Sequence, residues 1–148
     1  MHIVVITGSP HRNGTTAALA DAFIEGAREA GHDIFRFDAA KEKISPCLAC
    51  EHCRTKGRCI HDDGMQELLP VLEQAEMVVF VTPLYYFGMS AQLKLIIDKC
   101  YCRGLQLKNK KVGTIVVGGS PVDSIQYELI DKQFDCMAKY LSWDMIFQ

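Results

Sequence analysis

Short runs of β-branched residues alternate with longer amphipathic stretches along this chain, and that alternation restricts the fold more than any other feature. Residues 2–7 (HIVVIT) and 77–82 (MVVFVT) are almost continuously apolar, as strands covered on both faces are. Apolar residues recur at helical spacing in four other segments, which are residues 15–30, 65–75, 91–100 and 130–141. Strands that alternate with helices predict βαβ units and a parallel sheet.

Five strands are expected, at residues 2–7, 33–38, 77–82, 111–117 and 144–147. Residues 33–38 (DIFRFD) alternate and carry charges, which favours an edge position. Right-handed crossovers on such a sheet predict a doubly wound, three-layer αβα fold with the flavodoxin-like strand order 2-1-3-4-5. We expect one domain over residues 1–148, with a cysteine-rich loop at residues 45–63.

Composition excludes several classes of partner. A net charge of −2 gives no basic surface for nucleic acid. No apolar run approaches the ~20 residues that a membrane-spanning helix needs. The first residues enter a strand directly, without the basic region of a signal peptide. The sequence therefore predicts a cytoplasmic protein that binds neither nucleic acid nor membrane.

Three polar or aromatic segments follow predicted strands. They are residues 8–16 (GSPHRNGTT), 83–89 (PLYYFGM) and 118–121 (GGSP). Ligands of open α/β sheets bind beyond the carboxyl ends of the strands, at the point where the strand order reverses. The predicted order brings these three segments together there, so we expect them to form one binding site.

The first of these segments has the composition of a phosphate-binding loop. Gly8 and Gly14 allow a tight backbone path, while Ser9, Thr15 and Thr16 bring hydroxyl groups to the start of a helix. The free N–H groups and the dipole at a helix start favour an anion. The loop matches neither the dinucleotide fingerprint nor the Walker motif. Capping of an ordinary helix is the alternative for this segment taken alone.

The other two segments suit a flat ring system. Tyr85, Tyr86 and Phe87 supply planar groups, and Gly118-Gly119 permits close approach of the backbone. The aromatic residues could equally belong to the core. A phosphate together with a large planar heterocycle describes a mononucleotide, and flavin mononucleotide (FMN) fits best.

Four of the seven cysteines lie within thirteen residues, in the spacing C-x2-C-x2-C-x5-C at Cys47, Cys50, Cys53 and Cys59. Clustered cysteines in a reducing compartment indicate metal binding or redox chemistry before disulfides. Soft thiolate ligands select an iron–sulfur cluster or zinc. The triple C-x2-C run favours iron–sulfur, since structural zinc sites more often use two separated pairs.

With these motifs the chain resembles the flavodoxin-like NADPH-dependent FMN reductase family, and within it the iron–sulfur flavoproteins. The resemblance rests on residues 8–16, on the cysteine segment through Asp62-Asp63, and on residues 82–98 and 117–120. It departs at His11, where the family often has Arg, and at Thr15, where it often has Asn. Arg12 could supply the missing cation.

The resemblance implies a bound FMN, a 4Fe–4S cluster on the four cysteines, and a homodimer or homotetramer whose subunits complete each other's flavin sites. The residues implied for FMN are Ser9, His11, Arg12, Asn13, Gly14, Thr15, Thr16, Pro83, Leu84, Tyr85, Tyr86, Phe87, Gly88, Gly118 and Gly119.

The predicted activity is an FMN-dependent oxidoreductase. Electrons would pass from NAD(P)H or a ferredoxin-like donor to an acceptor, and flavin N5 would carry the chemistry without a catalytic acid–base pair. Two alternatives stay open. One is a cluster-free NAD(P)H-dependent FMN or quinone reductase, and the other is a non-enzymatic flavodoxin-like electron carrier or redox sensor.

Overall fold

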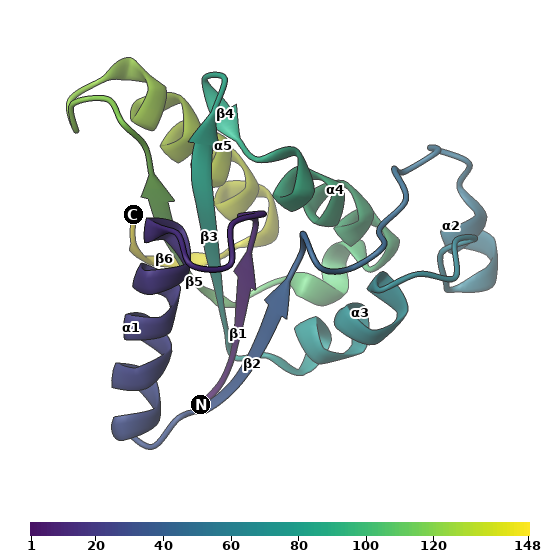
Figure 1. Cartoon of the computed structure of the whole chain (residues 1–148). Coiled ribbons are helices and arrows are strands. Elements are labelled where there is room, and N and C mark those ends of the chain that lie inside the picture. Colours follow the sequence, from purple (N-terminus) through teal and green to yellow (C-terminus); the bar gives the residue numbers. More distant parts are fainter.

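The computed structural model describes residues 1–148 and shows strands and helices in alternation (Figure 1). The elements are β1 (His2–Thr7), α1 (Thr15–Glu29), β2 (Asp33–Asp38), α2 (His52–Lys56), α3 (Met65–Gln74), β3 (Met77–Tyr85), β4 (Gly88–Met89), α4 (Ala91–Lys99), β5 (Lys111–Val117), α5 (Ile125–Leu141) and β6 (Asp144–Phe147). Two 3₁₀ turns, Cys100–Cys102 and Gly104–Leu107, connect α4 to β5. No helix combines the length and the apolar character needed to cross a membrane.

The parallel strands lie in the order β2-β1-β3-β5-β6, which places β2 at an edge as expected. The α/β class and the parallel sheet are confirmed. The expected set of five strands is wrong in one respect, because the sheet has a sixth strand. This strand, β4, pairs antiparallel with the end of β3, since β3 continues to Tyr85 and the chain folds back at once.

The sheet separates two apolar clusters of unequal size. On one face α3, α4 and α5 pack over the strands around buried residues such as Leu68, Phe80, Ile96 and Phe134. On the other face α1 alone covers β1 and β3, mainly through Ala20 and Ile24. The three layers are therefore uneven. The short helix α2 buries no residue and lies away from the sheet, beyond α3 and α4 (Figure 1).

Local sequence signals explain where the helix beside the predicted binding site begins. Ser90 precedes α4, and its hydroxyl accepts a hydrogen bond from the Leu93 N–H at 3.3 Å. This is the cap that a serine at a helix start provides, because it satisfies an N–H group that has no partner within the helix. The cap fixes the start of α4 directly beside the end of the first strand.

Candidate functional site

The loop after β1 lies against the start of α4. The Gly8 N–H donates to the Val81 carbonyl oxygen at 2.8 Å, which ties the loop to β3. A Cβ atom placed on Gly8 would lie 2.8 Å from the Leu93 Cβ and closer still to the Ser90 hydroxyl. Such contacts are shorter than packed atoms tolerate. Only glycine therefore allows the loop and α4 to approach this closely.

The loop after β5 lies against the end of β3. A Cβ atom on Gly118 would lie 3.1 Å from the Leu84 Cβ and 2.6 Å from the Tyr127 hydroxyl. Around Gly119 there is open space. The three predicted segments thus gather at one edge of the sheet, beyond the carboxyl ends of β1, β3 and β5 (Figure 1).

Within the first loop, most predicted residues are accessible. His11, Arg12, Asn13 and Thr15 are exposed, Ser9 and Gly14 are half-buried, and Thr16 is buried. Gly14 is the N-terminal cap residue of α1, and no side chain caps this end, so its N–H groups are left for a ligand. Gly8 and Gly14 have no positive φ, and their contribution is close packing.

A polar cavity of about 300 Å³ adjoins this loop. It lies between the loop and the end of β2, and its charged or hydroxyl-bearing lining comprises Thr7, Ser9, His11, Arg12, Arg36, Asp38 and Lys41. Three cationic side chains, Arg12, Arg36 and Lys41, face a single carboxylate there. The cavity is therefore suited to an anion.

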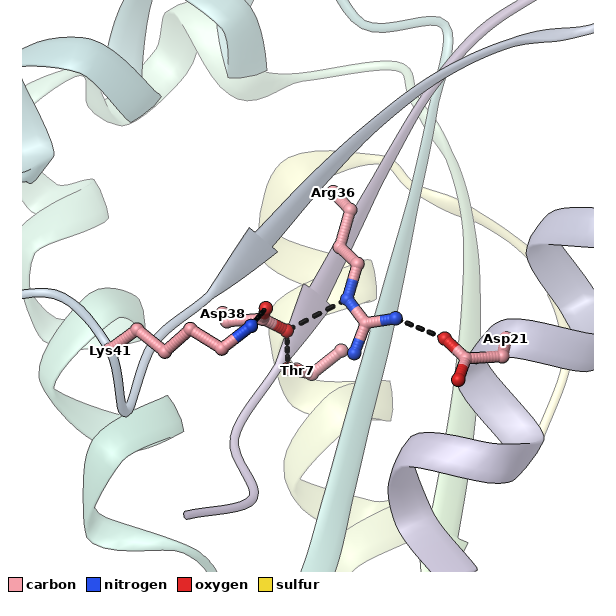
Figure 2. Close-up of polar contacts among 5 residues, drawn as sticks. All are labelled: Thr7, Asp21, Arg36, Asp38 and Lys41. Carbon is pink, nitrogen blue, oxygen red and sulfur yellow. Dashed lines mark hydrogen bonds and ion pairs between the residues drawn. The ribbon is translucent and has the colours of Figure 1, made fainter. Parts of the chain in front are cut away.

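Asp38 holds two of these cations, Arg36 and Lys41 (Figure 2). Its carboxylate accepts hydrogen bonds from Thr7 Oγ1 at 2.6 Å and Arg36 Nε at 2.8 Å, and it pairs with Lys41. Arg36 also pairs with Asp21 of α1. Burial acts to raise the pKa of Asp38, but the bonds from Lys41, Thr7 and Arg36 outweigh it and lower the pKa to about 2. The carboxylate stays ionised at neutral pH.

The aromatic segment forms a tight β-hairpin, where a loop was expected. Tyr86 and Phe87 are its two turn residues, with φ values of 43° and 69°. Their rings lie 5.3 Å apart in an edge-to-face arrangement, and Tyr86 is 96% exposed. Left-handed backbone at aromatic residues is strained, and strain of this kind gathers at functional sites. The hairpin thus presents two aromatic rings to solvent at the shared edge.

The remaining predicted residues of this segment flank the turn. Tyr85 is exposed, Leu84 and Gly88 are half-buried, and Pro83 is buried at the end of β3.

The cysteine segment forms an irregular loop beyond α3 and α4 (Figure 1). Cys47 and Cys50 are exposed, whereas Cys53 and Cys59 are half-buried. All four border one cavity of about 30 Å³. They suit a metal in number and chemistry, but no three His, Cys, Asp or Glu side chains are placed to hold a metal ion. The four thiols border the same cavity, but they do not point to a common centre.

Two further residues of this cavity could interact with the thiols, and the first of them escaped the sequence-based prediction. Cys102, in the 3₁₀ turn after α4, borders the same cavity and lies beside Cys53 and Cys59. His61 Nε2 is buried there without a hydrogen-bond partner. Sequence spacing could not reveal Cys102, because it reaches the loop through tertiary packing. Cys100 differs, since burial raises the pKa of its thiol to about 12 and it packs on the core.

A larger cavity, of about 730 Å³, lies elsewhere. It is mostly apolar and is bounded by α4, the 3₁₀ turns and α5, with Phe80, Ile97, Met137 and Trp143 among its lining. It includes Cys47 but none of the residues predicted to hold FMN. Size alone therefore does not identify the flavin site, which rests on the loops and their chemistry.

Known proteins are similar to this chain in sequence and in fold. A family model described as NADPH-dependent FMN reductase matches residues 1–136. An iron–sulfur flavoprotein of Methanocaldococcus jannaschii is 32% identical over 122 residues, covering 81% of this chain and 63% of that protein. One from Archaeoglobus fulgidus is 34% identical over 119 residues, covering 79% of this chain and 54% of the relative.

The solved structures include an NAD(P)H:quinone oxidoreductase from Methanothermobacter marburgensis. It superposes with a TM-score of 0.74 at 17% identity, covering 99% of this chain and 85% of that chain, which shows a shared fold. The chain spans only about 54% to 63% of the two relatives named above. The match over residues 1–136 shows that the chain belongs to the NADPH-dependent FMN reductase family.

Proposed function

We propose that the protein is an FMN-dependent oxidoreductase whose flavin lies at the carboxyl edge of the sheet. The observation that carries this proposal is that three segments meet there. Close contacts at Gly8 and Gly118, where a larger residue would not fit, and the Ser90 cap at the start of α4 hold them in place. One segment offers the start of α1 to an anion, and another offers two exposed aromatic rings. Family membership supports the same cofactor.

In this proposal the first loop holds the FMN phosphate. The hydroxyl groups of Ser9, Thr15 and Thr16 and the N–H groups at the start of α1 would bond its oxygens. Arg12, an exposed residue of this loop, would supply positive charge, His11 would offer a hydrogen bond, and Asn13 and Gly14 complete the loop. Arg12 thus compensates for the departure from the family pattern at His11, and Thr15 contributes its own hydroxyl group.

The flavin ring would lie between the hairpin and the loop after β5. Pro83, Leu84 and Gly88 would form its floor with Gly118 and Gly119, and Tyr85, Tyr86 and Phe87 would cover it. When bound, FMN would accept a hydride from NAD(P)H and pass one or two electrons to an acceptor. The chain's own task is to orient the ring and to exclude water. Because the aromatic turn stands free in one chain, a second copy would complete the cover, as in a homodimer or homotetramer.

The proposal extends to a 4Fe–4S cluster on Cys47, Cys50, Cys53 and Cys59, with a ferredoxin-like protein as an alternative donor to NAD(P)H. Support comes from the spacing of the thiols, their shared cavity and the names of the two relatives. Clustered thiols remain reduced in the cytoplasm, which is the compartment we propose. When bound, a cluster supplies one-electron transfer.

A second candidate is a cluster-free NAD(P)H-dependent reductase with the same flavin site. The observation that favours it is the family model itself, whose description is NADPH-dependent FMN reductase. In that case the cysteine loop would hold zinc or no metal.

Substitution of the loop hydroxyls tests the flavin site. In the double variant Ser9→Ala and Thr16→Ala we expect FMN to bind roughly tenfold to a hundredfold more weakly, because two hydrogen bonds to an anion are lost. Thr55→Ala, in α2, is the matched control and should bind FMN normally. Fluorescence titration with FMN measures both. Unchanged affinity in the double variant would remove the phosphate-loop assignment.

A further inference from the structure

A buried ion pair joins the end of the cysteine loop to helix α4. The side chains of Lys99 and Asp63 are only 1% and 5% exposed, and the Lys99 ammonium contacts Asp63 Oδ2. Neither residue belongs to the predicted flavin site or to the set of loop cysteines. Ionised groups are rarely buried so fully unless they are paired, so this contact calls for a specific role.

The Asp63 carboxylate also binds both ends of the loop. Its Oδ2 accepts a hydrogen bond from the Ser45 N–H at 3.0 Å, and its Oδ1 accepts one from the Met65 N–H at 3.2 Å. Ser45 is the first residue of the cysteine-rich loop, and Met65 begins α3 just beyond it. One carboxylate therefore closes the base of the loop.

The two chain segments at this base are in close contact. A Cβ atom on Gly64 would lie 3.0 Å from Ile44 Cδ1 and 3.2 Å from the Glu42 Cβ. The Gly64 N–H also faces the Lys43 carbonyl oxygen at 3.5 Å. The base of the loop is thus packed and hydrogen-bonded, with the ion pair at its centre.

The rest of the loop has much weaker support. Its helix α2 buries no residue, and Ala49 and Glu51 are held in left-handed conformations with φ values of 51° and 58°. Its other hydrogen bonds to the body of the protein are single contacts spread along the loop. The Tyr101 hydroxyl donates to Glu51 Oε1 at 3.1 Å, and the Arg103 and Gln66 side chains donate to the carbonyl oxygens of Gly57 and His61 at 2.5 and 2.8 Å. The position of the thiols therefore depends on how firmly the base is closed.

The surroundings of Asp63 favour its ionised form, which is the form that pairs with Lys99 and closes the loop base. Burial acts to raise the pKa of Asp63, but the bonds from Lys99 and from the Ser45 and Met65 N–H groups outweigh it and lower the pKa below its usual range. Removing Lys99 alone would leave a buried carboxylate without a counter-charge, which is far less favourable than removing both partners.

We propose that Lys99 is a positioning residue for the cysteine loop, acting through Asp63 to close the loop base and hold the thiols around one cavity. The consequence for metal binding rests on the proposed iron–sulfur site. The consequence for loop order does not depend on any metal. The proposal assigns this task to helix α4, which also begins at the flavin edge through Ser90.

The experiment compares Lys99→Met with Lys99→Arg and with Lys94→Met. Lys94 forms an exposed ion pair with Asp98 on the same helix, so its variant is a matched control. Hydrogen exchange is measured over residues 43–65, and iron, sulfide and FMN are assayed in the same anaerobically purified samples. In Lys99→Met we expect exchange of the Ser45 and Met65 amides to be roughly tenfold faster or more, with less iron and unchanged FMN. Lys99→Arg should restore both readouts.

The two readouts separate the two proposals. If the wild-type protein lacks iron, the cluster proposal fails, and the exchange data still decide the role of Lys99. If Lys99→Met exchanges over the loop base as slowly as Lys94→Met, the positioning role is overturned whatever the iron content. Should Lys99→Met fail to fold, the double variant Asp63→Asn and Lys99→Met removes both charges. Fast exchange at the loop base in that variant is expected, and wild-type protection would refute the proposal.

Discussion

The two candidate sites differ in how the fold supports them. The flavin edge is built from strand ends and helix starts that continue directly into the core, as where Gly8 packs against Leu93 of α4. The cysteine loop lies outside the sheet, and its short helix α2 has no buried residue. The Asp63 carboxylate closes the base of this loop. The sheet and the core hold the flavin edge in place, whereas the cysteine loop is held in place only by contacts at its base and along its length.

This difference indicates that the sites should fail separately. A change at the flavin edge disturbs core packing and should reduce both global stability and FMN binding. A change in the cysteine loop should affect local order and metal content, with little effect on global unfolding. The following substitutions test this contrast, beginning with the largest expected effect.

Gly8→Val should lower the free energy of unfolding by about 3 kcal/mol, because its side chain would overlap Leu93 and Ser90. FMN affinity should fall with it. Gly119→Ala is the control for stability alone, since its Cβ would meet no atom within 4 Å. Urea denaturation measures both variants. If Gly8→Val were as stable as the wild type, the flavin edge would not depend on the packing of Gly8 against the core.

Asp38→Asn should cost about 2 kcal/mol of stability at neutral pH, as follows from the lowering of its pKa to about 2. A carboxylate whose pKa is depressed on folding stabilises the protein above its unfolded pKa of about 4. That contribution is lost as the pH falls toward 2. The wild type and the variant should therefore converge in stability over this range.

The measurement for Asp38 is denaturant unfolding at a series of pH values, with the exposed Asp123→Asn as control. A constant gap between the wild type and Asp38→Asn down to pH ~2 would contradict the role given to the network in Figure 2.

Ala49→Gly should raise the free energy of unfolding by only about 0.5 kcal/mol, because glycine adopts its left-handed conformation without strain. Ala18→Gly, on the exposed side of α1, should lower it by about 1 kcal/mol. The opposite signs distinguish the strained loop from the regular helix. A large loss of stability in Ala49→Gly would show that the loop is part of the core.

Lys94→Met should change the free energy of unfolding by less than about 0.5 kcal/mol, because the exposed pair with Asp98 is screened by solvent. Thermal or urea unfolding in low and high salt measures it. An effect approaching that of Asp38→Asn would show that exposed charges on α4 matter as much as buried ones.

Much of the fold was predictable because local pattern and tertiary environment agree. The strands at residues 2–7, 33–38, 111–117 and 144–147 have the predicted bounds, and the first of them is an almost continuously apolar run, as is typical of a buried strand. The Ser90 cap is likewise predictable in principle, because serine is a preferred residue at the start of a helix. The β3–β4 hairpin was not. Its turn residues are Tyr86 and Phe87, whereas such turns usually show Asn-Gly or a similar pair.

The candidate sites were predictable only where the strand topology alone brings segments together. The topology brought the three predicted segments together, since parallel strands share a carboxyl edge. Cys102 and the pair of Lys99 with Asp63 could not be inferred. The pair joins residues 36 positions apart, and no periodicity or motif encodes such a contact. Sequence patterns indicate which segments meet, but they do not show which side chains hold a loop in place.

The most direct test is the absorption spectrum of protein purified without air, with FMN, iron, sulfide and zinc assayed on the same sample. We predict flavin bands together with a broad shoulder near ~400 nm and about four irons per chain, as a four-cysteine cluster requires. Flavin bands without iron would instead support the cluster-free reductase. Protein that neither retains FMN nor binds it when FMN is added would contradict the flavin site on which the proposed function rests.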